Sequence, residues 1–205
     1  MPFPTYAVST ELDAVNQILS SVGQAPVTTL DLQNPEVSIV LNTLREVNRQ
    51  VQSEGWIFNK ELNYVMQPDS STNQILYPYN ILQMDANDEY HKNQYDLVRR
   101  NGKLYDRLNH TFQFTDDVHV DITWYFDFTD VPPPIQTYIV ARAARMCATK
   151  LIGDQEINKL LAEQEIQTRA TALEYECNQG DYSMFGFKNG QQYYTSYQPY
   201  QALMR

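Results

Sequence analysis

Acidic side chains come closer to a catalytic pattern than any other residues of this 205-residue chain. Two carboxylates at a suitable separation are enough for glycoside hydrolysis. The candidate clusters are Asp116 with Asp117, then Asp85 with Asp88 and Glu89, and finally Glu163, Glu165, Glu174 and Glu176. The first two clusters fit turns, where aspartate bonds nearby backbone, and the third fits the solvated face of a helix. Hydrolase activity therefore stays an alternative hypothesis, but the sequence indicates no particular catalytic pair.

Histidines and cysteines form no recognisable catalytic or metal-binding motif. His91, His110 and His119 lack the H-E-x-x-H spacing of a zinc site, and Cys147 and Cys177 lie far from them in sequence. The chain also lacks the nucleophile elbow, the Walker phosphate loop and the dinucleotide-binding glycine motif. We therefore expect no catalytic residue, no metal site and no cofactor, and we interpret the histidines as surface or strand-pairing residues.

A basic cluster is better suited to binding than to catalysis. Arg99, Arg100 and Lys103 surround the dipeptide Asn101-Gly102, and Arg107 lies nearby. Asn-Gly favours a two-residue hairpin turn because both positions tolerate positive φ. Charges at such a tip can serve solubility alone, or they can dock onto an acidic partner surface.

The C-terminal segment carries a second candidate interface, made of aromatic side chains among Gly, Gln, Asn and Ser. These side chains are Tyr182, Phe185, Phe187, Tyr193, Tyr194, Tyr197 and Tyr200. The segment has no helical or strand period, and disordered tails are usually poor in aromatics. We expect an extended arm that becomes ordered by laying these rings on another surface.

The elements that hold these groups are helices on both sides of a β region. Thr10 with Asp13 and Asn34-Pro35-Glu36 mark two helix starts, and Gly23 and Gly55 mark the ends. Pro132 to Pro134 precede an alanine-rich helix over 135–151. Asp154 caps the last helix, which extends towards Cys177. Its apolar side chains are Ile157, Leu160, Leu161 and Leu173.

The segment between the helices reads as β structure. From about Glu61 to Val131, short runs of β-branched and aromatic residues are separated by turn residues. Apolar and polar side chains alternate from Val118 to Trp124, as in a half-buried strand. The sequence therefore predicts an α+β fold, a bundle of about four helices with an inserted antiparallel β region. The expected domains are 1–60 with 132–178 for the bundle, 61–131 for the β domain and 179–205 for the arm.

Charge and targeting signals restrict the function further. The formal net charge is −10, with 25 acidic and 15 basic residues, which argues against tight binding of nucleic acid. The N-terminus lacks the pattern of a signal peptide, and no apolar run is long enough to span a bilayer. We expect a protein made in a cytoplasm, with no membrane contact and with both cysteines reduced.

Two stretches of the N-terminal quarter resemble one family. Ala14 to Leu30 carry the pattern A-V-N-x-I-L-x-S-x-G-x-x-P-V-x-T-L, and Asn48 to Asn59 carry N-R-x-x-Q-S-x-G-W-x-F-N. This combination is similar to the tail tubular protein A family, the adaptors or gatekeepers of short-tailed bacteriophages (podoviruses). The resemblance is strong to about residue 61 and looser to about residue 178.

The resemblance implies a structural protein of the virion tail. It implies a ring of twelve copies that joins the portal protein to the nozzle, tail tubular protein B, around a channel for DNA ejection. DNA would pass through this portal–tail complex without tight or specific binding. The C-terminal arm would reach a neighbouring copy or the portal and become ordered on assembly. The alternative is an envelope glycan hydrolase associated with the phage tail.

Overall fold

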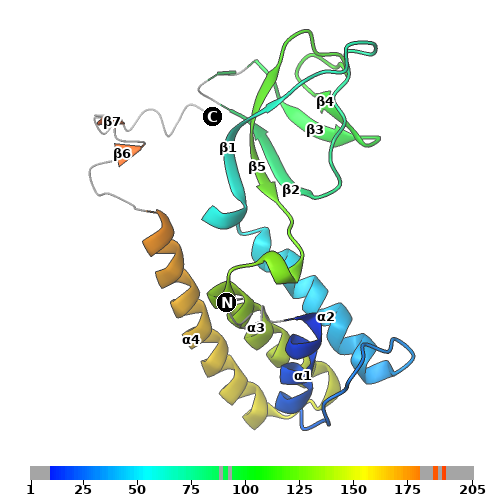
Figure 1. Cartoon of the computed structure of the whole chain (residues 1–205), viewed down its shortest axis with the longest axis vertical. Coiled ribbons are helices and arrows are strands. Elements are labelled where there is room, and N and C mark those ends of the chain that lie inside the picture. Colours follow the sequence, from blue (N-terminus) through cyan, green and yellow to red (C-terminus); the bar gives the residue numbers. More distant parts are fainter. Residues whose placement is uncertain (1–9, 88–89, 92–93, 181–186, 189–190, 193–205) are drawn as a thin grey trace, which may run out of the picture.

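The computed structural model describes residues 10–87, 90–91, 94–180, 187–188 and 191–192. Within these residues, four α-helices occupy one end of an elongated molecule and the strands of residues 60–124 occupy the other end (Figure 1). This confirms the predicted α+β class with an antiparallel β region between helices. The side chain of Phe187 and the predicted arm residues Tyr182, Phe185, Tyr193, Tyr194, Tyr197 and Tyr200 lie outside the described part.

Helix α1 (Glu11–Ser21) begins and ends at the predicted residues. The Thr10 hydroxyl accepts the Asp13 N–H at 3.2 Å, and the Asp13 carboxylate accepts the Thr10 N–H at 3.1 Å. These hydrogen bonds satisfy backbone N–H groups at the start of the helix. The Thr10 hydroxyl also donates to the Asp13 carboxylate at 2.7 Å, and this bond, together with the one from the Thr10 N–H, lowers the pKa of Asp13. Gly23 follows the helix at φ +74°, a left-handed conformation that glycine adopts without strain.

Helix α2 (Pro35–Gln52) is the central rod of the bundle. Asn34 caps it by accepting the Glu36 N–H at 3.0 Å, with proline at the first helical position as predicted. The helix has 18 residues and stops shortly before Gly55, which has φ +77°. Trp56 is then buried, which confirms that the exit from this helix packs into the core.

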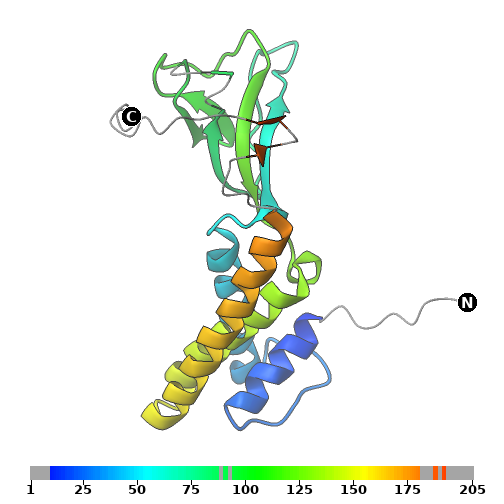
Figure 2. The ribbon, with the colours of Figure 1, turned by 90° about the vertical axis from the view of Figure 1, so that its left-hand side faces the viewer.

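Helices α3 (Pro133–Leu151) and α4 (Gln155–Gly180) form a helical hairpin. Gly153 breaks the chain between them at φ +74°. The Asp154 carboxylate accepts the Glu156 N–H at 2.8 Å and so caps α4 as predicted. The two helices lie side by side along their length in both views (Figures 1 and 2).

The helices share one apolar core. Helices α1, α2 and α3 pack on one another, and α4 packs on α3. The fully buried side chains of this core include Val15, Ile18, Leu41, Leu44, Ile135, Tyr138, Ile139 and Cys147. The alanines of the predicted alanine-rich helix, now α3, let neighbouring helices approach closely.

A three-stranded antiparallel sheet forms the centre of the β region. After the short 3-10 helix η1 (Ile57–Asn59), the strands β1 (Lys60–Met66), β5 (Val118–Trp124) and β2 (Ile81–Ala86) lie in the order β1-β5-β2. The predicted alternation along β5 is confirmed for Val118, Val120 and Ile122, which are buried. It fails at the end of the strand, where Thr123 is buried and Trp124 is half-buried.

A hairpin extends this region. Strands β3 (Leu97–Arg100) and β4 (Lys103–Asp106) pair across Asn101-Gly102, whose φ values of 51° and 70° confirm the predicted turn. Farther along the chain, the two-residue strands β6 (Phe187–Lys188) and β7 (Gln191–Gln192) pair with each other. The β region has its own apolar core of Met66, Ile75, Ile81, Leu97, Leu104, Phe114, Val118, Val120 and Ile122.

Two further predictions concern thiols and membranes. Both cysteines are free, with Cys147 buried and Cys177 exposed. Burial raises the pKa of the Cys147 thiol, although a hydrogen bond with Thr43 opposes that rise. Among the described residues, every helix is too short or too polar to cross a membrane.

Candidate interaction surfaces

Buried amide side chains join the helical bundle to the β region. The Gln52 Nε2 atom donates to Asn48 Oδ1 and to the Phe126 carbonyl, each at 2.8 Å, and Gln52 Oε1 accepts the Phe126 N–H at 2.8 Å. Asn59 Nδ2 donates to the Gln52 carbonyl at 2.9 Å and to the Trp124 carbonyl at 2.8 Å. Asn48, Gln52 and Asn59 are at most 1% exposed. We call these three residues the amide junction.

The amide junction explains one of the two sequence patterns that resemble tail tubular proteins. In N-R-x-x-Q-S-x-G-W-x-F-N, the first Asn, the Gln and the last Asn are Asn48, Gln52 and Asn59. The Trp of the pattern is Trp56, whose Nε1 atom donates to the Val51 carbonyl at 2.7 Å. Hydrogen bonds offset the lost hydration of a buried amide. Both polar atoms of the Gln52 amide and the Nδ2 atom of Asn59 have such bonds, whereas Asn59 Oδ1 has none among the described residues, so the pattern encodes a connection between two packing units.

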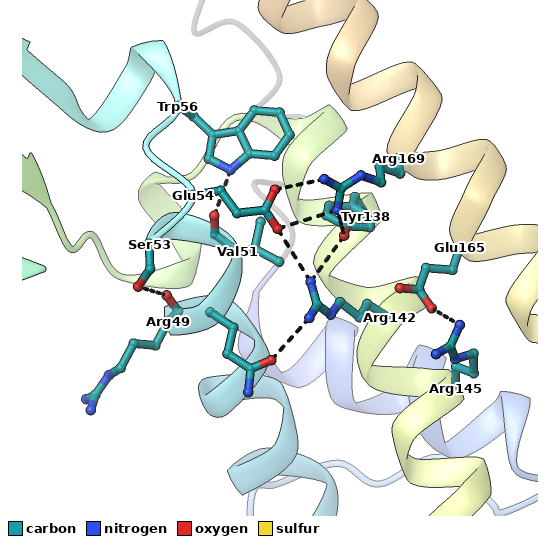
Figure 3. A network of polar contacts seen from close by, with 11 residues as sticks. Arg49, Val51, Ser53, Glu54, Trp56, Tyr138, Arg142, Arg145, Glu165 and Arg169 are labelled. Atoms are coloured by element: carbon teal, nitrogen blue, oxygen red, sulfur yellow. Dashed lines mark hydrogen bonds and ion pairs between the residues drawn. The ribbon is translucent and has the colours of Figure 1, made fainter. Parts of the chain in front are cut away.

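A cluster of charges ties three helices together near this junction (Figure 3). The Glu54 carboxylate, just after α2, forms ion pairs with the guanidinium groups of Arg142 of α3 at 3.5 Å and Arg169 of α4 at 3.1 Å. The buried Tyr138 hydroxyl accepts from Arg169 Nη1 at 2.7 Å and from Arg142 Nη1 at 3.3 Å. Arg142 also reaches Gln50 at 3.4 Å. These contacts, led by the Tyr138 hydrogen bond, raise the pKa of Arg169.

The chemistry of this charged cluster is structural. Its arginines keep their protons at every ordinary pH, so they hold Glu54 in place instead of exchanging protons with a substrate. Sequence reasoning missed the cluster. No local signal could have found it, because Arg142 and Arg169 lie 88 and 115 residues from Glu54 and only helix packing brings them together.

Two of the predicted solvated acids of α4 have structural partners, which corrects that interpretation. Glu165 Oε2 lies 2.9 Å from Arg145 Nη1, as Figure 3 also shows. Glu176 accepts the Ile57 N–H at 2.8 Å, and burial raises the pKa of Glu176 while this hydrogen bond lowers it. Glu163 and Glu174 are exposed, as predicted.

Asp116 and Asp117 lie in the loop before β5, as predicted, whereas Asp85 lies in strand β2 and not in a turn, which corrects that prediction. Asp116 accepts from the Thr115 hydroxyl, and Asp117 accepts from Gln67 Nε2 at 3.3 Å. Asp85 bonds the following N–H, and its predicted neighbours Asp88 and Glu89 lie outside the described residues. Sequence reasoning missed the fully buried Asp106, which accepts three hydrogen bonds and organises the turn after β4.

His119 lies in strand β5 opposite Val65 of β1, and it contacts His91, which lies outside the strands. His91 Nε2 accepts the His119 N–H at 2.9 Å, the His119 ring stacks on Tyr90, and His119 Nδ1 lies 2.7 Å from Asn63 Oδ1. His110 is exposed. Among the described residues, no three acidic, histidine or cysteine side chains converge on a possible metal position.

The basic cluster lies at the tip of the β3–β4 hairpin, as predicted, but its side chains already have partners. The Arg99 guanidinium lies 5.4 Å from the centre of the Tyr77 ring, and that of Arg100 lies 4.1 Å from the centre of the Tyr105 ring. Lys103 Nζ donates to Gln74 Oε1 at 2.6 Å. These contacts hold the charges against the β region while Arg99 and Arg100 remain exposed.

Helix α4 presents a second apolar stripe that sequence reasoning did not separate from the first. Leu161 and Ala172 face α3 and are buried, whereas Ile166 is 68% and Leu173 45% exposed. Ile166, Ala170, Leu173 and Cys177 follow one another at helical spacing, and all four are exposed. We call these four residues the outer stripe of α4.

Known proteins match most of this chain. The sequence pattern of the family described as "Tail tubular protein" covers residues 12–182. A similar relative is "Tail tubular protein A" of Klebsiella phage KP34. The two sequences are 26% identical over 156 residues, which represent 76% of this chain and 81% of the relative.

Proposed function

This chain belongs to the tail tubular protein family and is a structural component of a phage tail, and we propose that it is the adaptor between portal and nozzle. Twelve copies form a ring that binds the portal protein on one side and tail tubular protein B on the other. The ring surrounds part of the channel through which DNA is ejected. The KP34 relative, which carries the name tail tubular protein A, supports this choice within the family.

The outer stripe of α4 carries the proposal. An amphipathic helix normally has one apolar face, but α4 has a buried one on α3 and an exposed one opposite. Exposed apolar patches of this kind mark protein–protein contacts. The stripe is therefore a lateral surface on which a neighbouring copy packs in the ring.

The elongated shape supports two axial contacts. The bundle and the sheet lie at opposite ends of the molecule (Figure 1), and the amide junction holds them in one orientation. A subunit of this kind offers a separate surface to each axial partner. The net charge of −10 repels DNA phosphates, which suits a channel that DNA crosses without binding.

Electron microscopy of the full-length protein mixed with its cognate portal ring tests the proposal. Twelve-fold density below the portal is the expected result. A bare portal beside monomeric protein contradicts the adaptor role. Removing residues 181–205 is expected to leave a folded monomer that does not join the portal, and unchanged assembly of the truncated chain contradicts the role of the arm.

Thiol labelling tests the lateral contact separately. Cys177 belongs to the outer stripe and is exposed, whereas Cys147 is fully buried in the bundle. A maleimide should label Cys177 quickly in the free subunit and slowly in the assembled ring, while Cys147 stays unlabelled in both. Equal labelling of Cys177 in both states would place the subunit contact elsewhere.

A further inference from the structure

Two cations of the β3–β4 hairpin share one sheet face with an exposed leucine. Arg100 of β3 lies opposite Lys103 of β4, and Lys103 lies opposite Leu76 through an isolated bridge. Residues directly opposite each other in antiparallel pairing place their side chains on the same face. Leu76, Lys103 and Arg100 therefore form a row across three adjacent segments, which we call the Leu76 row. The hairpin lies in the half of the molecule away from the helices (Figure 1).

The two cations of the Leu76 row repel each other. Like charges directly opposite in a sheet are destabilising, and among the described residues no acidic side chain forms an ion pair with Arg100 or Lys103. Lys103 Nζ donates to the neutral Gln74, and Arg100 lies over the neutral ring of Tyr105. A negatively charged partner would offset this repulsion.

An apolar groove meets the row at Leu76. The Leu76 side chain is 72% exposed and lines a groove of about 410 Å³. The lining also contains Tyr64, Val65 and Met66 of β1 and the buried Ile75. Apolar contact area and unpaired positive charge therefore lie next to each other on one surface.

Strand β1 gives this groove an open backbone edge. Among the described residues β1 pairs only with β5, and six of its seven residues are exposed. A bulge interrupts the register between Glu61 and Tyr64, but residues 64–66 pair with β5 in regular register. The outward N–H and C=O groups of an edge strand can pair with another strand. The groove therefore suits an extended segment better than a helix.

Asp69 gives the groove an electrostatic direction, because it is the acidic residue of the lining. Its carboxylate accepts the N–H groups of Ser71 and Thr72 at 2.8 and 3.1 Å, so the charge is held in the turn after β1. A negatively charged segment is repelled at Asp69 and attracted at the Leu76 row. Its carboxylates should therefore lie at the row and not at the turn.

Charge and shape distinguish the possible occupants of the groove. The C-terminal segment 181–205 contains one acidic and two basic residues, so the cations of the row do not attract it. Glu163 and Glu174 beside the outer stripe of α4 are exposed acids, but they lie on a helix. Tight binding of nucleic acid conflicts with the net charge of −10. These differences favour an extended acidic segment of another protein.

We propose that an extended acidic segment of another virion protein lies in this groove, pairs with residues 64–66 of β1 and places its carboxylates on Lys103 and Arg100. An apolar side chain of the segment packs on Leu76. The inference goes beyond the proposed ring, because it assigns a contact to the β region and does not depend on the number of copies.

Photo-crosslinking in purified phage particles tests the proposal. The photoreactive amino acid benzoylphenylalanine replaces Leu76, and mass spectrometry identifies the peptide that becomes attached to it. The expected product joins this chain to an acidic segment of a different virion protein. The matched control is the same replacement at Leu108, an exposed leucine of the β region (57% exposed) outside the strands, which should not attach to that segment.

Charge reversal measures the contribution of the cations. R100E should lower the yield of this product about tenfold, because a glutamate there repels the carboxylates of the segment. K159E makes the same change of charge on the exposed Lys159 of α4 and should leave the yield unchanged. Arg100 is itself exposed, so the free R100E subunit should keep the melting temperature of the unmodified chain.

Each alternative occupant has its own result. A crosslink to a second copy, to DNA or to a segment without an excess of acidic residues overturns the proposal, and so does the absence of a crosslink at position 76. An unchanged yield in R100E overturns the role of the cations. The ring is measured separately by electron microscopy, so twelve-fold density can appear without the crosslink, and the crosslink can form where that density is absent.

Discussion

The helical bundle and the β region bury their apolar side chains differently. The bundle has a continuous core to which all four helices contribute, whereas the sheet has a smaller core and leaves β1 almost entirely exposed. Several loops of the β region depend on single polar side chains such as Asp106 and His91. The bundle thus has the larger core and carries the outer stripe of α4, whereas the β region, which the amide junction joins to it, leaves an apolar sheet edge exposed.

A leucine-to-alanine substitution in each of the two cores should show how strongly the unfolding of the two regions is coupled. Leu44→Ala in the bundle and Leu104→Ala in the β core each remove a fully buried side chain and should each lower the free energy of unfolding by about 3 kcal/mol. Urea unfolding followed by tryptophan fluorescence measures this, since Trp56 lies in the bundle core and Trp124 packs on the β core.

A shared transition is the expected behaviour in both variants. Because the junction couples the regions, single-tryptophan versions should report the same midpoint. A midpoint that moves for one tryptophan only would mean that the regions unfold independently. Leu160→Ala, at a position that is 68% exposed, is the control and should change stability by less than about 0.5 kcal/mol.

Gln52→Ala should separate the two regions. The substitution leaves the N–H and carbonyl groups of Phe126 and the Oδ1 atom of Asn48 without this partner, which costs about 2–3 kcal/mol. The two tryptophans should then report different midpoints. Gln167→Ala, an exposed glutamine on α4, is the control. A single unshifted transition in Gln52→Ala would show that apolar packing alone joins the regions.

Glu54→Gln should have a smaller effect that depends on salt. It removes the charge that Arg142 and Arg169 share, and all three side chains are 28–45% exposed, so we expect a loss of about 1 kcal/mol at low ionic strength. The loss should shrink in about 1 M salt because screening weakens the pair. Thermal unfolding at both salt concentrations measures it, with the exposed Glu163→Gln as control. A loss independent of salt would point to packing.

Glu176→Gln should have the smallest effect, visible as a change in pH dependence. Burial raises the pKa of Glu176 in the folded state, so folding favours the protonated form. The stability that this preference contributes is present below the unfolded pKa of about 4.5 and is lost as pH rises through the folded pKa. Glutamine stays neutral and keeps an acceptor for the Ile57 N–H.

The variant should therefore be slightly more stable than the unmodified protein at pH 7 and equal to it near pH 4. Melting temperatures across this range test the sign. A variant that is less stable at pH 7 would mean that the ionised carboxylate is the better acceptor for the Ile57 N–H, and that burial is not the dominant cost.

Local signals in the sequence determined the ends of most elements. The caps at Thr10 and Asn34, the glycine after α1 and the Asn101-Gly102 turn all act through hydrogen bonds or φ preferences within a few residues. Such interactions are complete without the rest of the fold. The hairpin position of Arg99, Arg100 and Lys103 followed from the same turn, and for that reason it could be predicted.

Tertiary structure alone decided which polar residues are buried and which apolar residues face outward. Gln52 and Asn59 look like ordinary helix and turn residues, but their partners Phe126 and Trp124 lie 74 and 65 residues away. Likewise, Leu161 and Ile166 are both apolar in sequence, and only the packing of α4 on α3 makes Leu161 a core residue and leaves Ile166 exposed. Burial depends on distant partners, because a side chain loses its water only when another part of the chain covers it.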